Sequence, residues 1–300
     1  PLVTTTSIDE NRNIPRSSKE EILAFVLSDY NQALGKLPTK ASTAAFACEY
    51  AVRAALARYY LYQKDWANAE KWSGQVIDSK QYSLDTLFST IVTKDFPGES
   101  ILEVGYTISD DPGTNSSIGL NNLFVSRREI IPSNQEVVSL ASSESGDRFS
   151  SIKFNSANLN GNDNGWSVAK YGTADEDNNN VIVFRLGEMY LIRAEARAQL
   201  GKVSGTGSAL EDINVLRKRA KGTLQSAVSQ NQMILLVENE RKYELAYEGH
   251  RWYDLVRTGR ASVVMPAFNS NWKSTYELWP IPQREIQTNL ALVGNQNPGY

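Results

Sequence analysis

The sequence predicts a mainly α-helical protein in which helical hairpins form a scaffold, with long loops and a few short strands. Apolar residues recur at helical spacing in the parts that span residues 17–78 and 181–300. Between them, residues 109–180 are rich in Ser, Asn, Gly and Asp and hold few long apolar periods. We therefore expect a single domain, residues 1–300, in which a loop-rich region with short strands, residues 79–180, separates two helical parts.

The first helices follow from capping residues and apolar spacing. Residues 1–16 look like an irregular arm, and a capping box over residues 17–21 starts a helix that Gly35 ends. Residues 42–63 predict a long second helix, whose alanines permit close contact with a neighbouring helix. Cys48 falls inside this stretch, so we interpret it as a small buried apolar residue.

The second and third helices meet at Asp65 and resemble a tetratricopeptide unit. In RAALARYYLYQKDWANAEKWSGQVID, residues 53–78, one helix ends, a short turn follows, and an aromatic residue with Ala opens the next helix. The pattern recurs over residues 188–220, where Gly201 suits the end of one helix and Ser208 the start of another. Hairpins of this kind stack into solenoids. In the middle of the chain, SILEVGYTIS, residues 100–109, predicts a strand.

The composition excludes several classes of function. The net charge of −3 gives no electrostatic case for binding nucleic acid or an anionic membrane surface. One cysteine and one histidine are too few for a disulfide framework or for a zinc site built on these residues. No apolar run approaches the roughly 20 residues of a membrane helix. We expect no cofactor and no bound metal.

The charged stretch ENERKYELAYEGHRWYDLVRTGRA, residues 238–261, holds the single histidine, His250. Glu240, Glu244 and Glu248 are four residues apart and would share one face of a helix. Catalysis by His250 would need a nucleophile or further ligands that the spacing does not supply. No pair of carboxylates stands out as it would in a glycoside hydrolase. We expect no catalytic residue here and interpret the stretch as scaffold, with ion pairs joining helices.

Several motifs, in order along the chain, resemble one known family. Two of them are the charged stretch, residues 238–260, and the C-terminal LWPIPQREIQTNLALVGNQNPGY, residues 278–300. The others lie upstream, at residues 54–84, 128–140 and 184–220. Together these motifs resemble the SusD/RagB family of outer-membrane nutrient-binding lipoproteins, and the resemblance runs from about residue 17 to residue 300.

The resemblance implies a non-enzymatic protein with a SusD-like α-α superhelix whose loops carry the ligand site. Family members bind glycans, or in some cases peptides, at the cell surface and pass them to a SusC-like TonB-dependent transporter. They reach the outer membrane through an N-terminal lipid anchor that is not visible in this sequence. We expect either that an N-terminal part of the family's chain lies outside this sequence or that the protein is a short variant.

The loop-rich region offers one set of residues suited to a sugar. Aromatic rings stack on the apolar faces of sugars, and amides, acids and Arg contact the hydroxyls. Trp166 and Tyr171 stand in a loop-like stretch with Asn162 and Asp163, which is the right mixture. The alternative is that GWSVAKYG, residues 165–172, is a short strand whose aromatic rings pack on the helices.

Two further loops are candidates by the same argument. NNLFVSRRE offers Asn121, Arg127 and Arg128, and AFNSNWKSTYE offers Trp272. The other tryptophans fall in helices or family motifs, and we assign them to the core: Trp66, Trp72, Trp252 and Trp279.

The stretch NGNDNG, residues 160–165, spaces three Asn residues like the first ligands of an EF-hand loop. The twelfth position of that loop would be Tyr171, where an EF-hand has Glu. We therefore reject an EF-hand and keep an isolated cation near Asp175 and Asp177 as an alternative.

For the function, we favour a glycan ligand, with a peptide-binding RagB-like protein as the first alternative and a tetratricopeptide adaptor as a less favoured one. The sequence does not name the sugar.

Overall fold

A computed structural model of the chain describes residues 1–91, 94–105, 120, 122–171 and 180–300. Helices take up 49% of the described residues and strands 9%, which confirms the prediction of a mainly helical protein. The chain divides into two compact units, of which one combines Pro1–Gln32 with His250–Tyr300 and the other is Ala33–Gly249. The expectation of a single domain stays a prediction.

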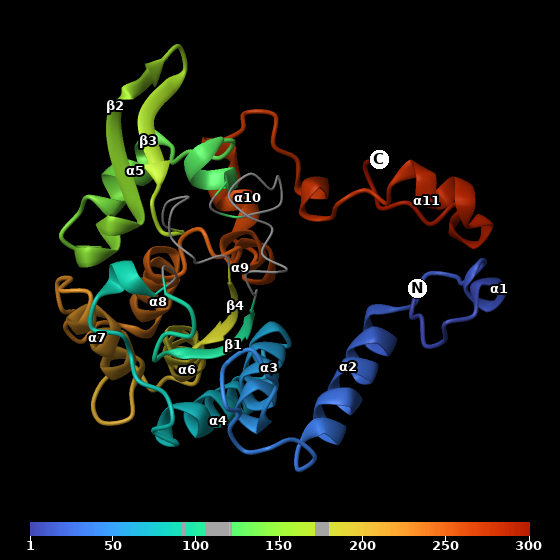
Figure 1. The fold of residues 1–300 in the computed structure, drawn as a ribbon, viewed down its shortest axis with the longest axis horizontal. Helices are drawn as coiled ribbons and strands as arrows, with labels where there is room; N and C mark the ends of the chain where they lie inside the picture. The colour runs from blue at the N-terminus through green and yellow to red at the C-terminus, as the bar shows by residue number, and fades with distance from the viewer. Residues whose placement is uncertain (92–93, 106–119, 121, 172–179) are drawn as a thin grey trace. The chain divides into compact units, whose positions relative to one another are not determined.

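Packed helices build the scaffold of the unit Ala33–Gly249 (Figure 1). The helix α6 lies at its centre and packs against α4, α7 and α8, while α3 packs against α4. The bounds of these helices are α3 (Glu49–Tyr62), α4 (Trp66–Asp78), α6 (Leu186–Gln199), α7 (Ala209–Arg219) and α8 (Gln230–Glu244). Both predicted helical hairpins are confirmed, because α3 contacts α4 and α6 contacts α7.

Small side chains and local caps explain why these helices form and pack closely. Ala54 and Ala57 of α3 and Ala194 of α6 are completely buried, so the helices approach without large side chains between them. Asp65 caps α4 by accepting a hydrogen bond from the Asn68 amide N–H at 3.1 Å. As predicted, Ser208 is the N-cap of α7 and Gly201 follows α6 with a φ of +78°.

The predicted helix over residues 42–63 begins only at Glu49, so this part of the prediction was wrong. The segment before it makes other backbone contacts: the Ala44 carbonyl accepts from the Glu103 N–H at 2.8 Å, and the Pro38 carbonyl accepts from the Glu49 N–H at 3.0 Å. Tertiary pairing thus overrides the helical propensity of the alanines. Cys48 is buried, as expected, but it is the N-cap residue of α3 and lies outside the helix.

Two antiparallel strand pairs accompany the helices in the described part of the chain. β1 (Ser100–Val104) pairs with β4 (Val181–Arg185), which leads directly into α6, and β2 (Ile152–Asn160) pairs with β3 (Asp163–Val168). The loop-like stretch around Trp166 therefore forms a hairpin, with Gly161 at φ +57° in its turn, while residues 172–179 lie outside the described residues. The predicted strand over residues 100–109 is confirmed to Val104, and residues 106–109 lie outside the described residues.

Short elements complete this unit and place the hairpin. They are η1 (Phe88–Thr90), the π-helix η2 (Asn122–Ser126), α5 (Asn134–Leu140) and the 3₁₀ helix η3 (Gly146–Ser151). A hydrophobic cluster joins η1, η2 and the end of the hairpin, and its buried members are Phe88, Ile91, Phe124, Val168 and Tyr171. The base of the hairpin is thus fixed to a core, and the remainder of β2 is mostly exposed.

The unit of Pro1–Gln32 and His250–Tyr300 contains short helices apart from α2, which runs to the first residue of the other unit. Its elements are α1 (Ile8–Asn11), α2 (Lys19–Ala33), α9 (Arg251–Arg257), α10 (Ala261–Val264), η4 (Met265–Ala267), η5 (Ser274–Glu277), α11 (Gln283–Thr288) and η6 (Leu290–Leu292). The capping box that was expected before α2 is present, since Ser18 and Glu21 exchange hydrogen bonds between side chain and backbone.

Candidate functional site

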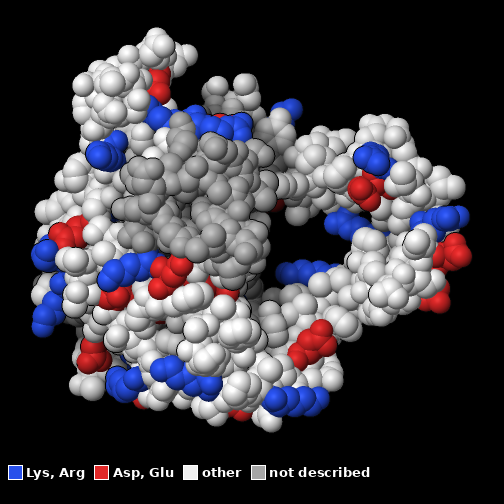
Figure 2. All heavy atoms as spheres, in the orientation of Figure 1, with Lys and Arg blue, Asp and Glu red and all other residues white. Residues whose placement is uncertain are grey.

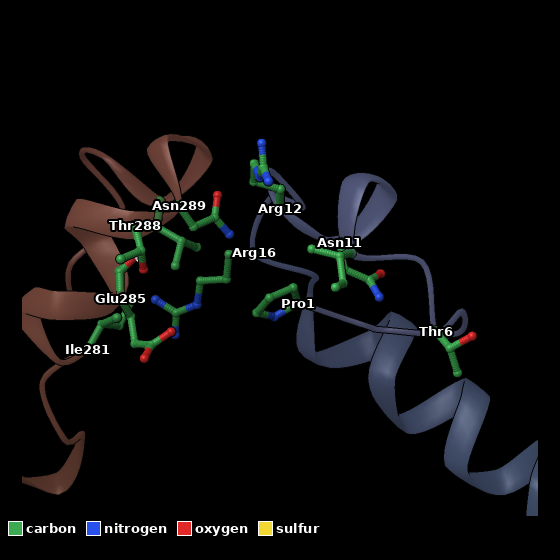
Figure 3. Close-up of a pocket in the computed structure, with 11 residues that line it drawn as sticks. Pro1, Thr6, Asn11, Arg12, Arg16, Ile281, Glu285, Thr288 and Asn289 are labelled. Carbon is green, nitrogen blue, oxygen red and sulfur yellow. Dashed lines mark hydrogen bonds between the residues drawn. The ribbon is translucent and has the colours of Figure 1, made fainter.

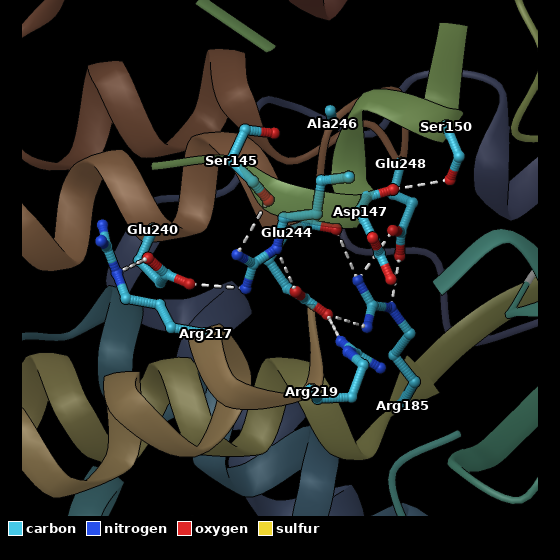
Figure 4. Close-up of polar contacts among 12 residues, drawn as sticks. Ser145, Asp147, Ser150, Arg185, Arg217, Arg219, Glu240, Glu244, Ala246 and Glu248 are labelled. Atoms are coloured by element: carbon cyan, nitrogen blue, oxygen red, sulfur yellow. Dashed lines mark hydrogen bonds and ion pairs between the residues drawn. The ribbon is translucent and has the colours of Figure 1, made fainter. Parts of the chain in front are cut away.

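The charged signature stretch folds into a buried network of ion pairs (Figure 4). α8 contributes Glu240 and Glu244, and Glu248 joins them from the turn after the helix, because α8 ends at Glu244 and not beyond it. Five carboxylates meet five cations in this network, which are Glu99, Glu144, Glu240, Glu244 and Glu248 with Arg148, Lys170, Arg185, Arg217 and Arg219. The network is therefore balanced in formal charge.

Glu244 lies at the centre of the network and has no exposed surface. Its carboxylate oxygens accept from Arg148 Nε and Arg185 Nη1, both at 2.8 Å, and from the Arg219 guanidinium. Burial alone would raise the pKa of Glu244, but the three arginines outweigh it and hold the pKa well below its ordinary value. Glu244 is therefore an ionised structural anchor with no oxygen left open to a substrate.

Glu248 has the same character. Arg185 binds both of its oxygens, through Nε and Nη2 at 2.8 Å each, and Lys170 donates to it as well. Burial opposes ionisation, yet Arg185 and Lys170 lower the pKa of Glu248 to about 2. Burial, together with the neighbouring Arg185, lowers the pKa of Lys170 in turn. The buried ion pairs support the interpretation of the signature stretch as scaffold.

The described residues form no cluster of side chains of the kind that binds a metal ion. No group of three or more His, Cys, Asp or Glu side chains gathers there as metal ligands would. Asp175 and Asp177, which the sequence offered as an alternative cation site, lie outside the described residues. His250 is the N-cap residue of α9.

A second group of residues, the hairpin cluster, is built from three aromatic rings: Phe149, Phe154 and Trp166. Trp166 of β3 lies directly across from Phe154 of β2, with ring centroids 5.4 Å apart, and its ring meets the edge of Phe149 of η3 at 5.7 Å. Phe154 is 47% exposed and Phe149 38%, while Trp166 is half-buried. The cluster thus combines fixed rings with accessible aromatic surface.

Arg128 fixes the hairpin cluster in place. Its guanidinium donates to Asp163 Oδ1 at 2.7 Å and to the Trp166 carbonyl at 2.9 Å. Asp163 also accepts from the Gly165 N–H at 2.9 Å. Arg128 and Asp163 therefore hold the start of β3 in place, and they form an ion pair with each other. Arg127 is about half exposed and pairs with Glu129 at the surface.

The hairpin itself is rich in amides and poor in charge. Five Asn residues lie between Ile152 and Val168, against two charged residues, Lys153 and Asp163. Figure 2 shows the projecting end of the hairpin as almost entirely uncharged. Asn162 is exposed in the turn, and its amide makes no hydrogen bond within the described part of the chain.

The structure thus places Asn162, Asp163 and Trp166 on one hairpin, which agrees with their grouping in the sequence. It also brings Arg128, a candidate from a separate loop, against this hairpin, and it adds the two Phe residues. Sequence reasoning missed Phe149 and Phe154, although the Gly-Asn turn is a hairpin signal. A regular register from this turn would place Ala157 across from Trp166, and Phe154 takes that place only because the pairing shifts between Phe154 and Leu159. The alternative that residues 165–172 form a short strand is partly correct, because Gly165–Val168 belong to β3. The ring of Trp166 packs on the rings of Phe149 and Phe154.

The other candidate residues have different surroundings. The ring of Tyr171 is buried and stacks on Phe124 at 5.2 Å, and its hydroxyl donates to the Tyr247 carbonyl, so it belongs to the core. Trp272 is half-buried in the other unit between Trp252 and Tyr276, each 5.9 Å away. Asn121 lies outside the described residues.

The assignment of the remaining tryptophans to the core was wrong for Trp279. This residue is 69% exposed, and Trp66, Trp72 and Trp252 are half-buried. The reason is that Trp279 lies in an irregular segment between η5 and α11, which offers no packed face to bury its ring.

A pocket of about 760 Å³ lies in the unit of Pro1–Gln32 and His250–Tyr300 (Figure 3). Arg16 reaches across it from the N-terminal segment and donates to the Asn295 carbonyl at 3.2 Å and to Asn297 Oδ1 at 2.9 Å. None of the eleven described residues that line this pocket is aromatic. It therefore lacks the stacking platform that the hairpin cluster provides.

Taken together, the geometry defines a class: a helical scaffold locked by buried ion pairs, with an aromatic and amide-rich hairpin on its surface and without a recognisable catalytic centre in the described residues. The family model described as SusD family matches residues 149–300, and the chain belongs to this family. Its members are binding proteins that catalyse no reaction. No helix among the described residues has the length and apolar character needed to cross a membrane.

Similar proteins include two curated relatives. The chain is 27% identical to SusD-like protein P38 of Formosa agariphila, over 94% of this chain and 65% of that protein. It is 36% identical to the starch-binding protein SusD of Bacteroides thetaiotaomicron, over 39% of this chain and 21% of that protein. The chain thus spans less than two thirds of the length of either relative.

A solved structure also matches the whole chain. A laminarin-binding SusD-like protein superimposes with a TM-score of 0.80 at 26% identity, covering 100% of this chain and 74% of that one. The predicted SusD-like fold is therefore confirmed.

Proposed function

We propose that this protein is a glycan-binding protein of the cell surface and that the hairpin cluster contacts the ligand. The observation that carries the proposal is the combination of the exposed rings of Phe149 and Phe154, and the half-buried ring of Trp166, with the exposed amide of Asn162 on an almost uncharged hairpin. Rings of this kind stack on sugar faces, and amides contact hydroxyls. A neutral or weakly charged glycan fits such a surface better than a strongly charged ligand does.

Within this proposal, the protein captures a polysaccharide or oligosaccharide and delivers it to a SusC-like TonB-dependent outer-membrane transporter. It is held at the outer membrane as a lipoprotein, through an N-terminal lipid anchor of the kind that the family resemblance implies. Support for the ligand class comes from the relatives named for starch and laminarin binding, both of which are glucose polymers. These two glucans are therefore the first ligands to test.

The experiment is a binding screen by affinity gel electrophoresis and calorimetry, with starch, laminarin, a broader polysaccharide panel and peptide digests. Trp166→Ala is compared with Trp72→Ala, which removes a half-buried tryptophan from α4 and serves as the matched control. Loss of one stacking ring is expected to weaken affinity about 5- to 30-fold, since aromatic contacts contribute about 1–2 kcal/mol. The products of each incubation are examined for hydrolysis.

Binding to one glycan class that is lost in Trp166→Ala, retained in Trp72→Ala and unaccompanied by hydrolysis would support both ligand class and site. Glycan binding that survives Trp166→Ala would reject the hairpin cluster and direct attention to Trp272. Binding of a peptide digest and of no glycan would overturn the glycan proposal in favour of a peptide-binding protein.

A further inference from the structure

A second pocket, of about 330 Å³, lies in the unit Ala33–Gly249 and shares no residue with the hairpin cluster. Three segments line it, which are residues 40–48, 81–83 and 96–101. Its volume lies at the lower end of the range of about 300–1,000 Å³ that small-molecule sites occupy. The pocket therefore suits one small molecule, such as a single sugar ring, better than a length of polymer.

Two aromatic rings line this pocket, and both are held in place. The ring of Tyr82 meets Tyr50 edge-on at 5.9 Å, and its hydroxyl lies 3.7 Å from Cys48 Sγ. Phe96 is 38% exposed and has a φ of +52°, which a bulky residue rarely adopts. Its N–H donates to Glu103 Oε2 at 3.3 Å, and this bond helps to hold the unusual backbone. Strained residues of this kind concentrate at binding sites.

Polar groups line the rest of the pocket. Ser42, Thr43 and Gln81 are exposed and bring two hydroxyls and one amide to the same space as the two rings. This pairing of aromatic surface with hydroxyl and amide groups is the chemistry that recognises a sugar, whose ring has apolar faces and a rim of hydroxyls.

The charge in this pocket has one sign. Lys40 lines it. Among the described residues, its ammonium makes a long contact of 3.4 Å to the Gln81 carbonyl and lies 6.0 Å from the centre of the Tyr82 ring. None of the described side chains that line the pocket carries a carboxylate. Neighbouring acids have other partners: Glu49 pairs with Arg53, Asp85 accepts from the Glu99 N–H, and Glu103 accepts from Asn180.

We propose that this pocket is a second carbohydrate site, which binds one sugar ring bearing a single anionic group. The rings of Tyr82 and Phe96 contact the apolar faces, Ser42, Thr43 and Gln81 meet the hydroxyls, and Lys40 pairs with the anionic group. The inference rests on the proposed function for the carbohydrate class of the ligand and assigns it a separate site. A uronate and a sugar sulfate share the required chemistry.

The test is methyl NMR of the full chain, read at Ala44 and Ile101, whose side chains line the pocket. D-glucuronate, D-glucose 6-sulfate, D-glucose and inorganic sulfate are titrated separately. We expect saturable shifts at both methyl positions with the two anionic sugars, with a Kd on the order of 1–10 mM for a ligand of this size. D-glucose binds about two- to fivefold more weakly, since an exposed ion pair contributes little more than this factor.

Three variants locate the site. Lys40→Ala removes the difference between D-glucuronate and D-glucose, whereas Lys36→Ala, an exposed lysine four residues earlier, retains it. Ser42→Trp fills the pocket from an exposed position and abolishes the shifts, while the methyl signals of the buried Leu56 and Leu61 confirm that the fold is intact. Equal binding of D-glucuronate by Lys40→Ala and the parent protein would overturn the role of Lys40.

Absence of a saturable shift at Ala44 and Ile101, or shifts that persist in Ser42→Trp, would overturn the second site. If inorganic sulfate caused shifts as large as those with the sugars, the pocket would bind anions without recognising a sugar, and the proposed sugar site would be rejected. Trp166→Ala separates this inference from the proposed function: it is expected to lose polysaccharide binding and to keep the Ala44 and Ile101 shifts. Retained polysaccharide binding with lost methyl shifts in Ser42→Trp would show that the two sites are independent.

Discussion

Two regions of the unit Ala33–Gly249 use polar side chains for opposite purposes. In the buried network, each oxygen of Glu244 and Glu248 already has a guanidinium or ammonium partner. In the hairpin region, the side chain of Asn162 has no hydrogen-bond partner among the described residues, and the rings of Phe149 and Phe154 in the hairpin cluster are exposed. The first region is saturated and the second is open.

The difference shows that charge density alone does not mark a binding site. A buried carboxylate is costly unless it is fully paired, so a dense cluster of buried charges satisfies itself and has nothing left to offer a ligand. An exposed amide or ring is solvated by water that a ligand can displace at little cost. The charged signature stretch is therefore the conspicuous part of the sequence, and the uncharged hairpin is the part that meets the ligand in our proposal.

The strongest way to break this comparison is Glu244→Gln. This change leaves Arg148, Arg185 and Arg219 without their shared carboxylate, and it is expected to lower the free energy of unfolding by about 3–5 kcal/mol. Urea denaturation measures the effect. The matched control is Asp78→Asn, whose side chain is 72% exposed and pairs with Arg193 at 3.3 Å, and which should cost no more than about 1 kcal/mol. Equal effects of the two changes would contradict the distinction.

The pH dependence of stability follows from Glu248. Its pKa is about 2 in the folded protein, against an ordinary value of 4.5. Because the folded pKa is depressed, the stabilisation is present above pH 4.5 and is lost as the pH falls toward 2, for a total of about 3 kcal/mol. Unfolding free energies measured at pH 7, 4.5 and 2.5 test this. Glu248→Gln should show a shallower loss between pH 4.5 and 2.5, and an unchanged slope would contradict the assignment.

Gly187 tests how closely the buried ion-pair network is packed. A Cβ at this position would lie 2.4 Å from Arg185 Nη1 and 3.0 Å from Glu244 Oε1, so Gly187→Ala must displace charged groups. We expect a loss of about 1–3 kcal/mol in unfolding free energy by thermal or urea denaturation. Gly74→Ala in α4 is the control, because its Cβ would meet ordinary contacts at 3.9 Å and should leave stability unchanged or improve it by up to about 1 kcal/mol.

The smallest effect on stability is expected at the hairpin turn. Asn162→Ala removes an exposed amide and should change the free energy of unfolding by no more than about 0.5 kcal/mol. Its affinity for the glycan should nevertheless fall about two- to tenfold, the value of one hydrogen bond. Calorimetry measures the affinity, with Asn231→Ala on the exposed start of α8 as the control. A loss of stability without a loss of affinity would place Asn162 in the scaffold.

The parts of the fold that could be predicted from the sequence are those set by neighbouring residues. Asp65 and Ser208 cap helices through bonds to residues three positions away, so their patterns are visible in a short window. The late start of α3 was not predictable, because it depends on a backbone bond between Ala44 and Glu103. Local propensity cannot report a contact of that range.

The candidate site shows the same limit. Trp166, Asn162 and Asp163 were predicted from residue type and loop-like composition, and the structure places them on one hairpin. Phe149 was missed because it reaches Trp166 from η3, a different element. Tyr171, only three residues beyond β3, faces the core instead, since its ring completes the cluster around Phe124. Which ring faces out is decided by packing partners that the sequence pattern does not name.

The sequence separations within the ion-pair network have a consequence for how the chain folds. Arg148 binds Glu244 across 96 residues, and Arg219 binds Glu99 across 120. Contacts of this range form slowly, since long loops must close before any pair is made. The carboxylates at 244 and 248 also come last, so a chain that emerges from its N-terminus holds unmatched arginines until the signature stretch has been synthesised. The network therefore delays the locking of the scaffold until both helical hairpins and the signature stretch are present.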